Sequence, residues 1–485
     1  MVLGTTSGAG KSWLATALCR WYANQGLKVA PFKAQNMSNN ARVVPTLGGG
    51  MGEIGSAQYF QALAARAEPD VRMNPLLLKP EADTRSQVVL MGEVNRELTE
   101  APWRGRSETV WPTLAAALDA LRLENDVVVI EGAGSPAEIN LYDSDVVNMR
   151  VAKHCDAACL LVTDIDRGGA FAHLYGTWAL LPEADRALIK GFVLNKFRGD
   201  TALLAPGPQM LQDLTGVPTV AVLPMWWQHG LPEEDGVFHG RPVAASPVNK
   251  TIAVIATPRI SNLDEFQPLN NVPGVHLKWA RSPADLAGAD WIILPGSKHT
   301  SSDLVWLRAQ GLDRAIAAHA GQCGAVLGIC GGLQMLGEAL IDPHGIDGNA
   351  PGLGLLPLVT LFEPAKTVQH TQAAFGPLAG AWTALAGVPV SGYEIHHGQT
   401  AQHPAMAAAG DIARVALTGP QGQPLGWQNA AGNVLGLYLH GLFEDPAVLQ
   451  ALFGASVPTL DSVFDGLADF MEKHFAPGGL AVLRG

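Results

Sequence analysis

The sequence lacks the features that mark membrane-bound, secreted and nucleic-acid-binding proteins. No uninterrupted apolar run reaches the roughly 18 residues of a membrane span, and no basic segment followed by an apolar stretch predicts a signal peptide. Only 16% of residues are charged, and the net charge is −12. The sequence contains no block of like charges, and both observations argue against nucleic-acid or anionic-membrane binding. The five cysteines form no CxxC pair and no disulfide spacing, so we expect a reducing, cytoplasmic environment.

Hydrophobic residues, in contrast, make up 48% of the 485 positions, enough for large cores. Non-alternating apolar runs in the first half end at glycine or polar residues, with helix-length stretches between them: 127–130, 157–162, 191–194 and 219–223. Such runs are typical of strands buried on both faces. The pattern predicts an α/β fold with a doubly wound parallel sheet, whose ligands bind beyond the carboxyl ends of the strands.

Fresh apolar runs near 252–255, 291–294 and 325–329 predict a second doubly wound α/β domain. A stretch rich in proline and glycine separates it from the first and is typical of a linker. The expected organisation is therefore a first domain, a linker, a second domain and a helical C-terminal tail: 1–228, 229–250, 251–446 and 447–485.

A glycine-rich loop from Gly4 to Ser12 directly precedes a predicted helix, 13–25. Backbone N–H groups of such a loop cradle phosphates, while Lys11 reaches the terminal oxygens and the Ser12 hydroxyl binds Mg²⁺. Five residues rather than four separate Gly4 from Gly10, and this spacing resembles the dethiobiotin-synthetase-like branch of P-loop proteins, which activate carboxylates with ATP. The expected ATP contacts in the loop are Thr6, Gly8, Ala9, Gly10, Lys11 and Ser12.

Three residues at other strand ends complete this predicted site. Glu131 is placed like the acidic metal ligand of that branch, and Lys33 would neutralise charge on the transferred phosphoryl group. Asn195 resembles an adenine-contacting asparagine. Ordinary surface side chains are the alternative interpretation for each.

A second chemical motif, Gly328-Ile329-Cys330-Gly331-Gly332, lies between a predicted strand and a predicted helix. Flanking glycines permit the sharp turn that exposes a nucleophile, and a helix N-terminus favours the reactive thiolate. His440 ends another apolar run and is the expected base. Backbone N–H groups at Gly296 and Gly331 are the expected oxyanion hole. A small buried cysteine in a glycine-rich turn is the alternative interpretation.

These residues resemble the class I glutamine amidotransferases, with the motifs at Gly296, Cys330 and His440 in that family's order. That family usually has His-x-Glu, but Leu442 stands two residues after His440, and neither Glu444 nor Asp445 has the usual spacing. The third member of the site is therefore missing or replaced. A Cys–His pair oriented by the backbone or by another acid is the expectation.

Over essentially the whole chain the sequence resembles the cobyric acid synthase family, within the cobyric and cobyrinic acid amidases. The resemblance rests on the runs at 31–40, 131–141, 164–169 and 392–398. It implies that ATP, Mg²⁺ and L-glutamine are used to amidate the b, d, e and g carboxylates of adenosylcobyrinic acid a,c-diamide, a corrinoid. The expected corrinoid contacts are Gln35, Asn36, Ser38, Asn39, Asp164 and Arg167.

Three other functions are alternatives to this one. One is a cobyrinic acid a,c-diamide synthase, which has a Gly-Pro-Asp-Tyr type sequence after the lysine that corresponds to Lys33; here Ala34 to Ser38 follow that lysine. Another is a different amidotransferase of the superfamily, such as a cell-wall precursor amidase. A partitioning-type ATPase switch would have no use for a Cys–His site. Glu394 and His396 could shape the glutaminase pocket or the domain interface, and the interface is the favoured interpretation. A homo-oligomer is compatible with this function.

Overall fold

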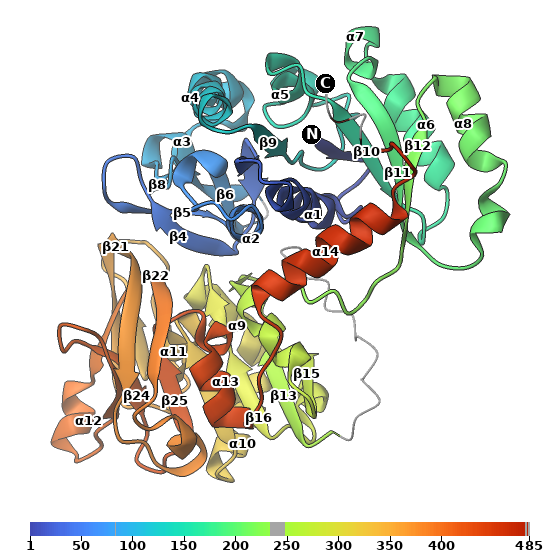
Figure 1. Cartoon of the computed structure of the whole chain (residues 1–485). Helices are drawn as coiled ribbons and strands as arrows, with labels where there is room; N and C mark the ends of the chain where they lie inside the picture. Colours follow the sequence, from blue (N-terminus) through green and yellow to red (C-terminus); the bar gives the residue numbers. More distant parts are fainter. Residues whose placement is uncertain (83, 233–247, 481–482, 484–485) are drawn as a thin grey trace.

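The chain forms two α/β halves, seen one above the other in Figure 1, with the C-terminal helix α14 (Leu460–His474) lying along the first half. This computed structural model describes residues 1–485 except 83, 233–247, 481–482 and 484–485. Within the described part, no helix combines the length and apolar character that a membrane crossing requires.

Four parallel strands form the centre of the first half in the order β1-β10-β11-β12, and the parallel pair β2-β9 continues this sheet through a bridge between Val2 and Glu131. The predicted parallel α/β architecture is therefore confirmed. The strands, with their bounds, are β1 (Val2–Gly4), β2 (Val29–Phe32), β9 (Val127–Ile130), β10 (Cys159–Asp164), β11 (Ile189–Phe197) and β12 (Thr219–Pro224).

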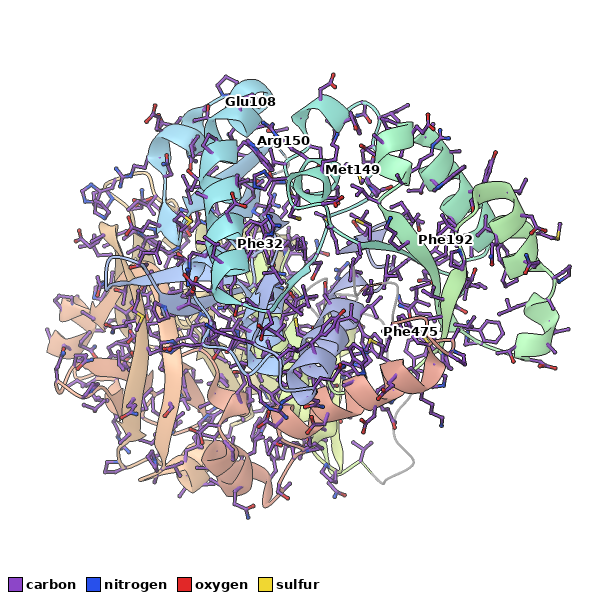
Figure 2. The ribbon with its side chains drawn as sticks, turned by 45° about the horizontal axis from the view of Figure 1, so that its top comes forward. Phe32, Glu108, Met149, Arg150, Phe192 and Phe475 are labelled. Atoms are coloured by element: carbon purple, nitrogen blue, oxygen red, sulfur yellow. The ribbon has the colours of Figure 1, made fainter. Side chains whose placement is uncertain are left out.

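Successive residues of these strands pack into two separate cores, one on each face of the sheet, which explains why the strands are apolar throughout. On β10, Leu160 packs in the core that contains α1 (Lys11–Asn24) and α14, whereas its neighbour Leu161 packs in the core that contains α6 (Ala170–Leu180). Figure 2 shows Phe192 on β11 and Phe475 at the end of α14. A strand covered on both faces has no solvent side on which polar residues could alternate.

Helix α14 brings the end of the chain back onto the first half. Phe464 is buried against α1, and the guanidinium of Arg20 lies 5.4 Å from its ring centre. Arg20 also pairs with Asp461. The predicted tail therefore divides: α13 (Pro446–Phe453) packs on the second half and α14 on the first.

Between β2 and α4 (Trp103–Glu124) lies a group of short strands that the apolar pattern did not predict. A four-stranded sheet has the order β3-β6-β7-β8, and the antiparallel hairpin β4-β5 pairs Ala41 with Gly55. Helix α2 (Ser56–Ala64) follows this hairpin. The strands are β3 (Gln35–Met37), β4 (Ala41–Pro45), β5 (Met51–Gly55), β6 (Leu76–Ala82), β7 (Arg85–Leu90) and β8 (Glu93–Val94).

The second half contains an eleven-stranded mixed sheet with a parallel centre, β15-β13-β16-β18-β25. This centre confirms the predicted α/β domain, whereas the antiparallel extension, including the long hairpin β21-β22, was not predicted. The predicted linker 229–250 lies largely outside the described residues. The strands named here are β13 (Lys250–Ile255), β15 (Val275–Ala280), β16 (Trp291–Leu294), β18 (Ala325–Ile329), β21 (Leu358–Phe375), β22 (Pro389–Gln402) and β25 (Val434–Leu437).

Candidate active sites

The glycine-rich loop between β1 and α1 is held in place by the end of β11. Gly10 has φ 102°, and a Cβ at this position would lie 2.0 Å from the Asn195 side-chain nitrogen, so both conformation and space require glycine. The Asn195 amide donates to the Ala9 carbonyl at 2.9 Å, and Lys196 Nζ donates to the Gly8 carbonyl at 2.9 Å. Asn195 therefore supports the loop; its predicted adenine contact stays a prediction.

Glu131 is the centre of a buried polar cluster at the carboxyl end of β9. Its Oε1 accepts from Ser12 Oγ at 2.8 Å and from Lys33 Nζ at 2.9 Å, and its Oε2 accepts from Gln61 Nε2 at 2.6 Å. Burial alone would raise the pKa of Glu131, but the Lys33 ammonium and these hydrogen bonds lower it. A carboxylate that is kept charged thus lies beside the loop, and Gln61, on α2, is a partner that the sequence analysis missed.

The hydroxyl and carboxylate oxygens of Ser12 and Glu131 are the hard donors that Mg²⁺ prefers. Among the described residues no cluster of three or more His, Cys, Asp or Glu side chains forms a metal cage. A site with only the Ser12 and Glu131 oxygens fits an ion that takes most of its ligands from phosphate and water. Lys11 Nζ donates to the Thr6 and Gly134 carbonyls at 3.1 and 3.2 Å, next to the same oxygens.

A cavity of about 850 Å³ opens above this cluster. It brings together most residues predicted for ATP, metal and corrinoid: Gly8, Gly10, Lys11, Ser12, Lys33, Gln35, Asn36, Glu131, Asp164, Arg167 and Asn195. Thr6 and Ala9 contribute backbone carbonyls to the loop instead. Its aromatic wall was not predicted: Trp226, after β12, stacks on Phe470 of α14 with ring centres 4.7 Å apart.

Two predicted corrinoid contacts, Ser38 and Asn39, do not line this cavity, and their role stays a prediction. Ser38 is buried and its Oγ accepts from the backbone N–H of Asn40 at 3.0 Å. Asn39 donates to the Pro80 carbonyl at 3.2 Å. Both residues follow the end of β3 and lie in the turn into β4, where these side chains bond to neighbouring backbone.

Cys330 occupies a strained turn between β18 and helix α11 (Gly331–Leu336). Its φ of 50° is rare for a residue with a side chain, and its N–H is fixed by the Leu437 carbonyl at 2.8 Å. A Cβ on Gly332 would lie 1.9 Å from the Leu294 carbonyl oxygen, so the turn can pack on β16 only with glycine there. The geometry is that of a nucleophile elbow.

The His440 side chain interacts electrostatically with the Cys330 thiol and is oriented by Glu265. Its Nδ1 lies 3.0 Å from Glu265 Oε1, and the other carboxylate oxygen accepts from the Gly441 N–H at 2.9 Å. Burial would lower the pKa of His440, but the Glu265 carboxylate and the Cys330 thiol raise it to about 10. The third member is therefore replaced: Glu265, on the 3₁₀ helix η4 (Leu263–Asn271), supplies the acid.

The residues predicted for the oxyanion hole lie next to this pair. A Cβ on Gly296 would be 2.9 Å from His440 Cε1, and one on Gly331 would be 2.7 Å from the backbone nitrogen of Ser297. The Gly296–Ser297 strand and Gly331 therefore lie side by side, next to Cys330 and His440. That their N–H groups form an oxyanion hole stays a prediction.

Strand β22 passes behind the nucleophile. Cys330 Sγ lies 3.7 Å from the Ile395 carbonyl, and the neighbours of Ile395 belong to a polar network of the second half. Glu394 accepts from Thr371 Oγ1 at 2.6 Å and lies 3.1 Å from His396 Nε2, while the His396 ring stacks on Tyr438. These contacts of Glu394 and His396 lie within the second half, which favours the pocket alternative over the domain interface.

Comparison with known proteins agrees with this division of the chain. Residues 1–227 match the CobQ/CobB/MinD/ParA nucleotide binding domain, and residues 251–448 match the CobB/CobQ-like glutamine amidotransferase domain. A nucleotide-binding domain joined to a glutamine amidotransferase domain defines an amide-forming ligase.

Full-length relatives make the assignment more specific. Proteins named cobyric acid synthase from Polaromonas sp. (strain JS666), Variovorax paradoxus (strain S110) and Polaromonas naphthalenivorans (strain CJ2) are 75%, 76% and 76% identical to this chain. The alignments cover 100%, 99% and 100% of the chain and 97%, 98% and 98% of those proteins. The chain belongs to the cobyric acid synthase family.

Proposed function

We propose that the protein amidates the b, d, e and g side-chain carboxylates of adenosylcobyrinic acid a,c-diamide, using ATP and L-glutamine, and so forms adenosylcobyric acid. The observation that carries this proposal is the presence, in one chain, of a charged Ser12–Glu131–Lys33 cluster beside a phosphate loop and a Cys330–His440–Glu265 arrangement. The first suits carboxylate activation, and the second suits ammonia release from glutamine.

In the first half, a substrate carboxylate oxygen attacks the γ-phosphorus of ATP, the bond to ADP breaks, and an acyl phosphate forms. Lys11 and Lys33 bind the phosphoryl oxygens on which charge accumulates. Ser12 and Glu131 would hold Mg²⁺, which supplies further charge neutralisation at the β- and γ-phosphates.

In the second half, the Cys330 thiolate attacks the glutamine amide carbon, and the amides at Gly296 and Gly331 stabilise the oxyanion. His440 gives its proton to the departing nitrogen, which leaves as ammonia, and water then hydrolyses the thioester to glutamate. Glu265 keeps the His440 ring oriented and its charge compensated. Ammonia attacks the acyl phosphate, phosphate leaves, and the amide forms.

The direct test supplies glutamine labelled at the amide nitrogen, Mg·ATP and adenosylcobyrinic acid a,c-diamide, and follows the corrinoid by mass spectrometry. Four labelled nitrogens per corrinoid are expected, with glutamate and ADP formed in equal amounts. Amidation of cobyrinic acid but not of its a,c-diamide would instead identify an a,c-diamide synthase. ATP hydrolysis without glutamate release would identify an ATPase switch.

A further inference from the structure

Arg42 belongs to the first half but is buried against the second. It lies on β4, and its side chain is 2% exposed. Its Nη1 and Nη2 donate to the two carboxylate oxygens of Glu444 at 2.8 and 2.6 Å, and Nη2 also donates to Asp264. A bidentate arginine–carboxylate pair fixes both distance and orientation, so this contact sets how the two halves meet here.

Both acids adjoin the residues that orient the nucleophile pair. Asp264 directly precedes Glu265 on η4, and Glu444 follows Gly441, whose N–H donates to Glu265, by three residues. Three carboxylates thus lie close together, two of them buried and Glu444 partly exposed, where like charges repel. The imidazole of His440 faces one of them, and the Arg42 guanidinium faces the other two.

A ring stack provides a second connection between Arg42 and the base. The Arg42 guanidinium lies 5.0 Å from the centre of the Tyr393 ring, and the Tyr393 and His440 rings stack with centres 5.3 Å apart. Backbone hydrogen bonds of 3.2 and 2.9 Å also join Tyr393 and His440. The residues that support the His440 ring on two sides, Tyr393 and the η4 segment, therefore both contact Arg42.

The residue before β4 fastens the same segment through side-chain amides. Asn40 Oδ1 accepts from the Leu263 N–H at 3.0 Å, and Asn262 Oδ1 accepts from the Ala41 N–H at 2.9 Å. Asn262 is the residue before η4. The start of the helix that carries Glu265 is thus anchored to the first half at two further points.

We infer that Arg42 is a positioning residue for glutamine hydrolysis, supplied to the glutaminase by the synthetase half of the chain. It neutralises Asp264 and Glu444 and holds η4 and Tyr393, so that Glu265 and His440 keep the geometry that activates Cys330. The inference rests on the glutaminase activity proposed above. It assigns the completion of the glutaminase to a residue that lies outside the amidotransferase domain.

Arg42 also adjoins the nucleotide cluster. Its guanidinium lies 4.9 Å from the ring centre of Phe60 on α2, and the next residue of that helix, Gln61, donates to Glu131. One helix therefore contacts both the carboxylate of the phosphate site and the arginine that supports the glutaminase.

The test compares Arg42→Met, which removes the charge and keeps an apolar stem, with Arg42→Lys, which keeps the charge but loses the fork. Glutamate release and ammonia-dependent amidation are measured in the full-length protein. The matched control is Lys366→Met, because Lys366 on β21 forms a buried ion pair with Glu53 on β5 and so also joins the β4-β5 hairpin to the second half.

Arg42→Met should lower kcat for glutamate release about tenfold, since it leaves buried acids unpaired. The KM for glutamine should stay within twofold, Arg42→Lys should recover part of the loss, and ammonia-dependent amidation should be retained. Lys366→Met should leave glutamate release within twofold.

Unchanged glutamate release in Arg42→Met would overturn the inference and leave the proposed function standing. Equal losses of both reactions in Arg42→Met and Arg42→Lys would make Arg42 a structural anchor and would also overturn it. Wild-type protein that releases glutamate without amidating the corrinoid would refute the proposed substrate only.

Discussion

Replacing Glu265 with glutamine tests the least expected member of the glutaminase site. Glu265 accepts two hydrogen bonds, from His440 Nδ1 at 3.0 Å and from the Gly441 N–H at 2.9 Å. Glutamine is nearly isosteric but has one carbonyl oxygen and one NH₂ group, so it can accept from only one of these donors. A lost hydrogen bond to a charged group is worth about 1.5–3 kcal/mol, and about 2 kcal/mol in the transition state lowers kcat/KM for glutamine about 30-fold.

The same substitution changes the pH dependence of glutamate release in a definite direction. The Glu265 carboxylate favours the imidazolium and helps to hold the pKa of His440 at about 10 against the opposing effect of burial. Neutral glutamine removes this attraction, so the pKa of His440 falls. The alkaline limb of the glutaminase profile should therefore move to lower pH.

Glutamate release by Glu265→Gln is measured from pH 6 to 10, with ammonia-dependent amidation as the control for folding. The control should stay within twofold of wild type. A variant with wild-type kcat/KM and an unmoved alkaline limb would refute the role assigned to Glu265. Loss of both activities together would show that Glu265 serves the fold and not the base.

Four further outcomes are expected. Cys330→Ala should abolish glutamine-dependent amidation but retain the ammonia-dependent reaction, whereas Lys11→Ala should abolish both, as measured by product formation. Glu131→Gln should lower ammonia-dependent amidation about 100-fold and leave glutamate release within twofold, because a buried charge is lost only at the nucleotide site. An electrophilic glutamine analogue should label Cys330 and not Cys159, whose pKa burial raises to about 11, as read by peptide mass spectrometry. Phe464→Ala should lower the free energy of unfolding by about 3–5 kcal/mol, because Phe464 is buried where α14 packs on α1. Denaturant unfolding should detect this as a lower midpoint.

The parallel strands could be predicted because a strand that is buried on both faces has a continuous apolar run in its sequence. The insertion between β2 and α4 gave no such signal. Strand β3 begins with two polar residues, Gln35 and Asn36. The hairpin β4-β5 buries residues in two clusters, one shared with the second half and one within the first, so neither element has a clean period of two. Its structure depends on contacts that local sequence does not contain.

The site divides along the same line. Cys330 and His440 lie in motifs that combine a strand end with glycine, and such motifs are visible in a single sequence. Glu265 and Arg42 lie 175 and 398 residues before His440, at positions that only the tertiary fold brings together. The absence of a glutamate two residues after His440 predicts that the third member is missing or replaced, but no spacing rule leads from Leu442 to η4.

The nucleotide site and the glutaminase site are connected through side-chain contacts as well as through the chain. Ser12 and Lys33 donate to Glu131 and also border the space for the phosphates, so a bound nucleotide must share or exchange these donors. Gln61 does not depend on that exchange and keeps Glu131 tied to α2. The neighbouring Phe60 packs on Arg42, so a shift of the Glu131 carboxylate that moves α2 would also move the surroundings of the arginine that holds η4. Ammonia costs a glutamine each time it is released, and a base held in place from the synthetase side is a physical means of restricting that release to the assembled protein.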